Sequence, residues 1–121
     1  EGTIEALSHE GFRVLAAGEN PYISQYYEIG ENLSYVGYTA RTYDFSSSEF
    51  MSADKVLDKC SSSLDNDGLC VIMIHPQDYL MADRTKIDED KYAEFVKLLD
   101  GLENLDADFK NFKDIANCEA Y

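Results

Sequence analysis

The sequence predicts an α/β protein whose mainly parallel sheet is flanked by helices. Residues 69–74 are aliphatic or sulfur-containing throughout, a pattern typical of a strand buried on both faces. Residues 52–68, before this run, have the pattern of an amphipathic helix. A second amphipathic pattern follows at residues 88–105. A helix, a turn and a buried strand in succession form half of a βαβ unit, which indicates a parallel sheet.

The first elements are predicted to be a short helix and a strand. Ile4 and Leu7 share one face of a helix over residues 3–10, and Gly11 follows at the position where a glycine ends a helix. Residues 12–17 are then predicted to form a strand of mixed burial. This strand stops at a turn cluster in residues 18–21.

Residues 18–34 are predicted to form an irregular loop rich in tyrosine. Tyr22, Tyr26 and Tyr27 lie close together in it. A loop of this length is uncommon in a compact domain unless it binds a ligand or covers a surface. Tyrosine rings stack on sugars, and they equally pack on a core as a lid, so both interpretations stay open. Tyr22 is the candidate carbohydrate-binding residue of this loop.

The middle of the chain is predicted to form strands and then a helix. Residues 33–45 are rich in β-formers and predict one or two short strands, broken near Gly37 or Ala40, before a loop at 46–48. Ser52 is a predicted helix N-cap, with Asp54 in the first turn. The apolar face of this helix is predicted to contain Val56, Leu57, Cys60 and Leu64.

The C-terminal third is predicted to contain a second helix that packs on the sheet. Asp88 is its predicted N-cap. Its apolar stripe is predicted to contain Tyr92, Phe95, Val96, Leu99 and Leu102. Residues 109–112 are predicted to form a last strand, and residues 113–117 a terminal helical turn.

Composition limits the classes of partner. The chain has 121 residues, enough for a single α/β domain or for a fragment of a larger one, and a net charge of −14. We therefore expect neither nucleic-acid binding nor an anionic membrane surface as a partner. No run approaches the length of a membrane-spanning helix. Cys60 and Cys70 are predicted to be small buried apolar residues, with a disulfide between them as the alternative.

The aliphatic run ends on a candidate catalytic residue. Pro76 cannot donate to a sheet ladder, so the strand is predicted to end with His75 at its carboxyl tip. In α/β sheets and barrels, ligands bind at these tips. A histidine at a strand end also serves simply as a hydrogen-bonding residue, and position alone does not separate the two roles. Asp78 and Tyr79 add polar groups to the loop that follows.

This aliphatic strand, the His-Pro pair and the polar loop resemble the last motif of the polysaccharide deacetylase family. The helix and strand in residues 1–16 and the helix from Tyr92 to Leu105 resemble neighbouring units of that family, although only His75 is a sharp motif. The resemblance implies that the chain is the C-terminal half of a distorted (β/α) barrel. It implies metal-dependent removal of acetyl groups from N-acetylated sugars by a longer parent protein, located in the cell envelope or outside the cell.

The resemblance also implies roles for individual residues. His75 would protonate the leaving amine, with Asp44 ranked first, before Asp78 and Asp83, as the acid that orients it. Tyr22 and Tyr79 would contact the carbohydrate substrate. The family's zinc ligands lie upstream, so this chain is expected to contain no metal site and to be inactive alone. A half barrel also leaves sheet surface uncovered, which predicts a homo-oligomer.

The alternative is a non-catalytic acidic α/β module that binds a protein or carbohydrate partner. A receiver-like signalling domain is one version of it, but the first strand would then end in an acidic pair. Here the predicted strand ends in Ala16, Ala17 and Gly18, which argues against that version.

Overall fold

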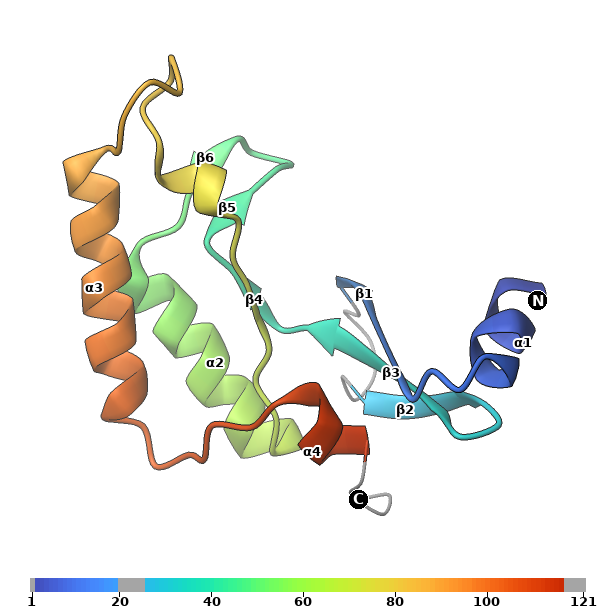
Figure 1. The fold of residues 1–121 in the computed structure, drawn as a ribbon. Helices are drawn as coiled ribbons and strands as arrows, with labels where there is room; N and C mark the ends of the chain where they lie inside the picture. Colours follow the sequence, from blue (N-terminus) through green and yellow to red (C-terminus); the bar gives the residue numbers. More distant parts are fainter. Residues whose placement is uncertain (1, 20–25, 117–121) are drawn as a thin grey trace. The chain divides into compact units, whose positions relative to one another are not determined.

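The computed structural model describes residues 2–19 and 26–116. It divides the chain into two compact units, unit 1 with residues 1–38 and 108–121 and unit 2 with residues 39–107. Figure 1 shows the elements of both units in sequence order. The fold is mixed α/β. In place of the single mainly parallel sheet that the sequence predicts, the described residues form three small sheets, two of which contain a parallel pair.

Unit 1 is built around a three-stranded mixed sheet. It contains α1 (Gly2–His9), β1 (Val14–Glu19), β2 (Tyr26–Gly30), β3 (Leu33–Tyr38) and α4 (Phe112–Ala116). The strand order is β1-β3-β2, with β1 parallel and β2 antiparallel to β3. Strand β3 lies in the centre, and its residues Leu33 and Val36 are almost fully buried. Helix α4 contacts β1.

The predicted end of α1 is confirmed in atomic detail. The amide of Phe12 donates to the carbonyl of Leu7 at 3.0 Å, and the amide of Gly11 donates to Ser8 at 3.1 Å. Gly11 has φ +81°, a left-handed conformation that costs a glycine little. These two bonds are the Schellman pattern, which satisfies carbonyls that the helix end leaves free.

Two predictions in unit 1 are wrong. The stretch predicted as an irregular loop contains β2, which joins β3 through a tight turn with Asn32 at φ +55°. Tyr22 lies outside the described residues. The predicted strand at 109–112 is also absent from the described structure, because Phe112 begins α4 and residues 109–111 have no regular structure.

Unit 2 contains two helices and two small sheets. Its strands are β4 (Ala40–Arg41), β5 (Tyr43–Asp44), β6 (Glu49–Phe50) and β7 (Ile72–Met73). Its helices are α2 (Ala53–Asp67), the 3-10 helix η1 (Pro76–Tyr79) and α3 (Glu89–Glu103). Strands β4 and β7 pair in parallel, and β5 and β6 form an antiparallel hairpin. The β-rich stretch thus contains three short strands, with breaks at Thr39 and Thr42, where one or two were predicted.

Helix α2 begins and ends where the sequence predicts. The Ser52 hydroxyl accepts a hydrogen bond from the Lys55 amide at 3.4 Å. Gly68 follows the last turn at φ +70°, and its amide donates to Leu64 at 2.9 Å. Val56 and Cys60 are buried as predicted, together with Ala53 and Ser63. Both signals are local, which is why the sequence locates this helix well.

Helix α3 packs on α2, and the prediction that it packs on a sheet is wrong. The core of unit 2 contains Ala40, Ala53, Val56 and Leu98, all nearly inaccessible. Leu98 was not in the predicted apolar stripe. Three members of that stripe, Tyr92, Val96 and Leu99, are instead 41–47% exposed.

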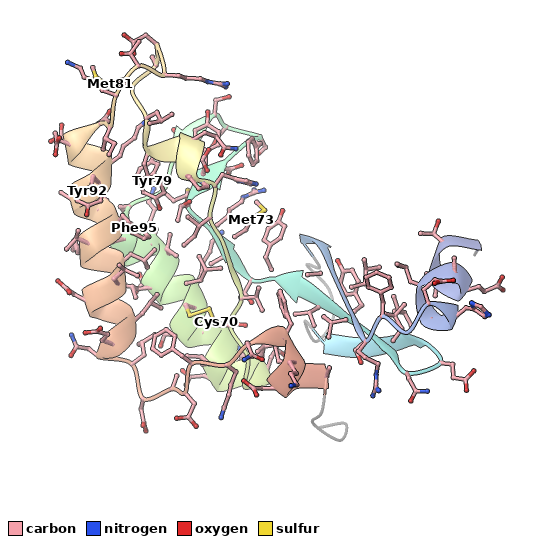
Figure 2. All side chains as sticks on the ribbon, viewed as in Figure 1. Cys70, Met73, Tyr79, Met81, Tyr92 and Phe95 are labelled. Atoms are coloured by element: carbon pink, nitrogen blue, oxygen red, sulfur yellow. A yellow bond between two sulfur atoms is a disulfide. The ribbon has the colours of Figure 1, made fainter. Side chains whose placement is uncertain are left out.

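Cys60 and Cys70 form a disulfide, with their Cα atoms 5.2 Å apart. Figure 2 shows this bond beside the Cys70 label. The sequence favoured two separate buried cysteines, so the structure supports the alternative interpretation. The bond ties the middle of α2 to the extended residues that precede β7. It thereby fixes the start of the aliphatic run against the helix.

The aliphatic run is not the central buried strand that was predicted. Only Ile72 and Met73 form a strand, and β7 pairs on one side alone, in a two-stranded sheet. Both residues are half-buried, and Ile74 is 37% exposed. The parallel pairing is confirmed, but the half-burial of the run shows that its two faces are not both covered. The resemblance to polysaccharide deacetylases therefore rests on the sequence alone.

Candidate functional site

His75 lies between β7 and η1, two residues beyond Met73, where β7 ends, and so not at the strand tip itself as the His-Pro pair predicts. Its backbone is extended, with φ −114° and ψ 123°, and Pro76 opens the 3-10 helix. The imidazole stands edge-on to the Phe45 ring, with centroids 5.8 Å apart. Its side chain is 36% exposed. Two cavities among the described residues, of about 720 and 430 Å3, are lined by other residues, so neither supplies the cleft expected beside His75.

The acid within ion-pair distance of His75 is Asp78. Its Oδ2 lies 3.5 Å from Nδ1 of the imidazole, and its side chain is only 9% exposed. One turn of η1 brings the two residues together, because positions i and i+3 eclipse in a 3-10 helix. The three-residue spacing of His75 and Asp78 in the sequence was therefore a signal that Asp78, and not Asp44, is the acid nearest to His75. At this distance the pair is an ion pair only when His75 is protonated, and Oδ2 accepts no hydrogen bond from the described residues.

Asp44, which the sequence ranked first as this partner, is engaged elsewhere. Its Oδ1 accepts hydrogen bonds from the Ser46 hydroxyl at 2.6 Å, the Ser46 amide at 2.9 Å and Arg41 Nη2 at 2.9 Å. The two bonds from Ser46, with the charge of Arg41, lower the pKa of Asp44 from 3.8 to about 2. These contacts stabilise the turn between β5 and β6. A catalytic role for Asp44 stays a prediction.

Tyr79 is buried in an aromatic cluster. Its ring stands edge-on to Phe50 and Phe95, with centroids 5.3 and 5.2 Å away, and the residue is 8% exposed (Figure 2). Burial raises the pKa of the Tyr79 hydroxyl, and the nearby charge of Asp78 raises this pKa further. The Thr42 hydroxyl lowers the pKa but does not cancel the rise. Whether this tyrosine also contacts a carbohydrate stays a prediction.

Three buried polar atoms gather beside this cluster. The hydroxyls of Thr42 and Tyr79 and the Oδ2 of Asp78 complete no hydrogen bond within the described part of the chain. The Thr42 hydroxyl lies near enough to lower the pKa of Tyr79 without meeting hydrogen-bond geometry. Buried polar groups are normally paired, so this group of atoms is unusual. Among the residues described, no three His, Cys, Asp or Glu side chains are placed to hold a metal ion.

The exposed side of α3 is a second candidate site, and it is the larger one. Ile87 is 50% exposed, Tyr92 47%, Leu99 44% and Val96 41%. The last three are spaced i, i+4 and i+7, so they form one stripe along the helix. Ile87 extends the stripe. It directly precedes the N-cap residue Asp88, and an apolar residue at that position typically packs on the first turn of the helix as a hydrophobic staple. We call these four residues the α3 outer face.

Acidic side chains border the α3 outer face. Three exposed carboxylates lie within about 90° of the stripe around the helix axis: Glu89, Asp100 and Glu103. None of the three side chains has an ion pair within residues 2–19 and 26–116. The lysines of α3 are occupied: Lys97 binds Asp54 at 2.8 Å, and Lys91 donates to the Leu80 carbonyl at 3.4 Å. The hydrogen bond to Asp54 raises the pKa of Lys97.

Sequence reasoning missed this surface because it assigned the whole apolar stripe to the core. Its amphipathic pattern contained the signal, since α3 is apolar over an arc wider than one neighbour can cover. In the described part of the chain, no helix is both long and apolar enough to cross a membrane. Comparisons with family models, curated proteins and solved structures found no match to this chain.

Proposed function

We propose that this chain is a non-catalytic acidic α/β module that binds a protein partner through the α3 outer face. The observation that supports this proposal is the exposure of Tyr92, Val96 and Leu99 in one stripe on a regular helix. Single exposed apolar residues are ordinary, but a contiguous apolar surface with a polar border is typical of an interaction site. An amphipathic helix from a partner fits such a surface, with its own apolar residues at the same spacing.

The test is selection of binders from a displayed library of helical peptides with apolar residues fixed at i, i+3, i+4 and i+7. Selected peptides are measured against the wild-type chain and a variant with Tyr92, Val96 and Leu99 changed to serine. We expect the variant to lose at least about tenfold in affinity, which corresponds to about 1.4 kcal/mol. A control changes Phe45 and Met81 to serine, since these residues are also exposed in unit 2 but lie outside α3.

Two results decide this proposal, provided that circular dichroism shows both variants folded. It stands if the α3 variant loses binding and the control keeps it. It fails if peptides bind both variants as tightly as they bind the wild type, or if the library yields no binder.

A second candidate function follows from the pairing of His75 with Asp78. We propose it as the role implied by the resemblance to polysaccharide deacetylases, in which His75 protonates the leaving amine in a longer protein that supplies zinc. The observation in its favour is the Asp78 carboxylate 3.5 Å from the imidazole, the position of an acid that orients a catalytic histidine.

The test of this second candidate uses a longer protein that contains the zinc ligands. There, His75→Ala would lower turnover of N-acetylated oligosaccharides by roughly 100- to 10,000-fold and leave zinc affinity unchanged. Unchanged turnover would refute the role, and lost zinc binding would make His75 a ligand instead.

A further inference from the structure

We infer that the partner of the α3 outer face is a basic amphipathic helix. This inference rests on the proposed function and names the chemistry of its partner. The apolar stripe alone does not select a partner, because any apolar helix could cover it. The charges that border the stripe determine which kind of helix binds there.

The border of the stripe is acidic and not neutralised. Glu89 lies in the first turn of α3, while Asp100 and Glu103 lie in the last turns, so carboxylates stand at both ends of the stripe. The two lysines of α3 itself, Lys91 and Lys97, are engaged in other contacts. Lys97 is held by Asp54, and Lys91 lies over the Phe50 ring at 5.7 Å and donates to Leu80. A partner with lysines or arginines beside its own apolar residues would meet unpaired carboxylates along one side of the stripe, at both of its ends.

The same charges disfavour the two competing occupants. A second copy of this chain would bring another net charge of −14 to the same surface. It would also place Glu89 and Glu103 against like charges in any antiparallel pairing of the two helices. An acidic or neutral amphipathic helix would bury the stripe but leave the carboxylates unpaired. A basic helix satisfies both requirements, and it would also be steered towards the chain by the overall field.

The dimensions fit a helix of ordinary length. The segment from Ile87 to Glu103 rises about 24 Å at 1.5 Å per residue, so a partner helix of about 16–18 residues would cover it. Three exposed acidic residues of α2, Asp58, Asp65 and Asp67, offer a matched set for comparison. They carry the same charge but border no exposed apolar stripe of that helix.

The experiment uses three synthetic helical peptides of about 18 residues with identical leucine spacing. Their polar positions are lysine, glutamine or glutamate. Affinity is measured by fluorescence anisotropy for the full chain, for the triple variant Glu89→Gln, Asp100→Asn, Glu103→Gln, and for a control with Asp58, Asp65 and Asp67 changed to asparagine. Both variants lose three negative charges.

We expect the lysine peptide to bind most tightly and to weaken as salt is added. The α3 border variant should bind it about tenfold more weakly, because three exposed charge contacts of about 0.5 kcal/mol each are lost. The α2 control should bind within about threefold of the wild type. Equal losses in both variants would mean nonspecific charge attraction and would overturn the inference.

The remaining outcomes separate the inference from the proposed function. If the glutamine or glutamate peptide binds as tightly as the lysine peptide, and the serine variant of the α3 outer face loses this binding, the partner chemistry is wrong and the proposed function stands. If every peptide binds the serine variant as tightly as it binds the wild-type chain, both the inference and the proposed function fail. Sedimentation that shows a dimer lost in Val96→Asp would make a second copy the occupant and overturn the inference.

Discussion

Gly101 of α3 lies against the Leu57 side chain of α2. A Cβ atom placed on Gly101 would overlap both methyl groups of Leu57, one of them at 2.9 Å, and would approach its Cγ at 3.2 Å. Gly101 lies inside a helix, where glycine normally costs stability, and a methyl group fits there only if the end of the Leu57 side chain turns aside. Both helices contribute residues to the core of unit 2, and Leu57 packs against that core.

Replacing Gly101 with alanine is expected to lower the free energy of unfolding by at most about 2 kcal/mol. Overpacking costs about 1–3 kcal/mol, and removing a helical glycine offsets about 1 kcal/mol of that cost. Urea denaturation of Gly101→Ala, Leu57→Val and the double variant measures this effect. We expect the Leu57→Val change to recover part of the loss, and strictly additive changes would contradict the proposed overlap.

Glu94 is expected to stabilise the start of α2. Its Oε2 accepts a hydrogen bond from the Ala53 amide at 2.6 Å, which satisfies a free donor in the first turn. Glu94→Ala should lower the melting temperature and cost about 1–2 kcal/mol. Glu103→Ala, which removes an unpaired carboxylate from the same helix, is the control and should change stability little. Equal effects of the two changes would show that the contact with Ala53 is unimportant.

Stability should depend on pH through Asp44. Its pKa is about 2 in the folded chain against an ordinary 3.8, so folding favours the charged form. This contribution is fully present above about pH 4 and is lost as the pH falls towards 2. The difference in melting temperature between wild type and Asp44→Asn should therefore shrink over that interval. A difference that stays constant from pH 6 to pH 2 would contradict the lowered pKa.

The disulfide is expected to contribute about 3 kcal/mol to the stability of unit 2. It closes a loop with a sequence separation of 10, and a crosslink of that size restricts the unfolded chain. Replacing Cys60 and Cys70 with alanine should lower the urea midpoint of the oxidised protein. The double variant should then be insensitive to reductant. If reduction leaves the wild-type midpoint unchanged, the bond does not contribute in solution.

Tyr79→Phe is expected to leave stability unchanged or to raise it slightly. The Tyr79 hydroxyl is buried without a hydrogen bond to the described residues, so removing it removes a desolvation cost. The ring contacts with Phe50 and Phe95 would remain. Calorimetry of the variant checks this expectation. A loss above about 1 kcal/mol would mean that the hydroxyl has a partner after all.

The parts of the fold that local chemistry determines could be predicted from the sequence. Ser52 and Gly68 locate α2, and Gly11 locates the end of α1, because caps and left-handed turns depend on a few adjacent residues. Pro76 begins η1, although β7 already ends at Met73, before the predicted strand end at His75. The mixed α/β class followed from the same local patterns.

The parts that depend on distant neighbours could not be predicted. Periodicity could not decide which half of the wide apolar arc of α3 is buried, so it selected Leu99 where the structure buries Leu98. The burial of residues 69–74 depended on which elements pair with and pack on them, and among the described residues β4 alone pairs with β7. The Cys60–Cys70 bond depended on the chain reversal at Gly68, which returns the strand segment to α2.

The division of unit 1 between two chain segments has a consequence for folding during synthesis. Every residue of unit 2 lies between positions 39 and 107, whereas α4 reaches β1 from beyond position 108. On the ribosome, the pairing of α2 with α3 and the closure of the Cys60–Cys70 bond can be complete before α4 leaves the exit tunnel. Strand β1 therefore waits for α4, and unit 1 is completed after unit 2.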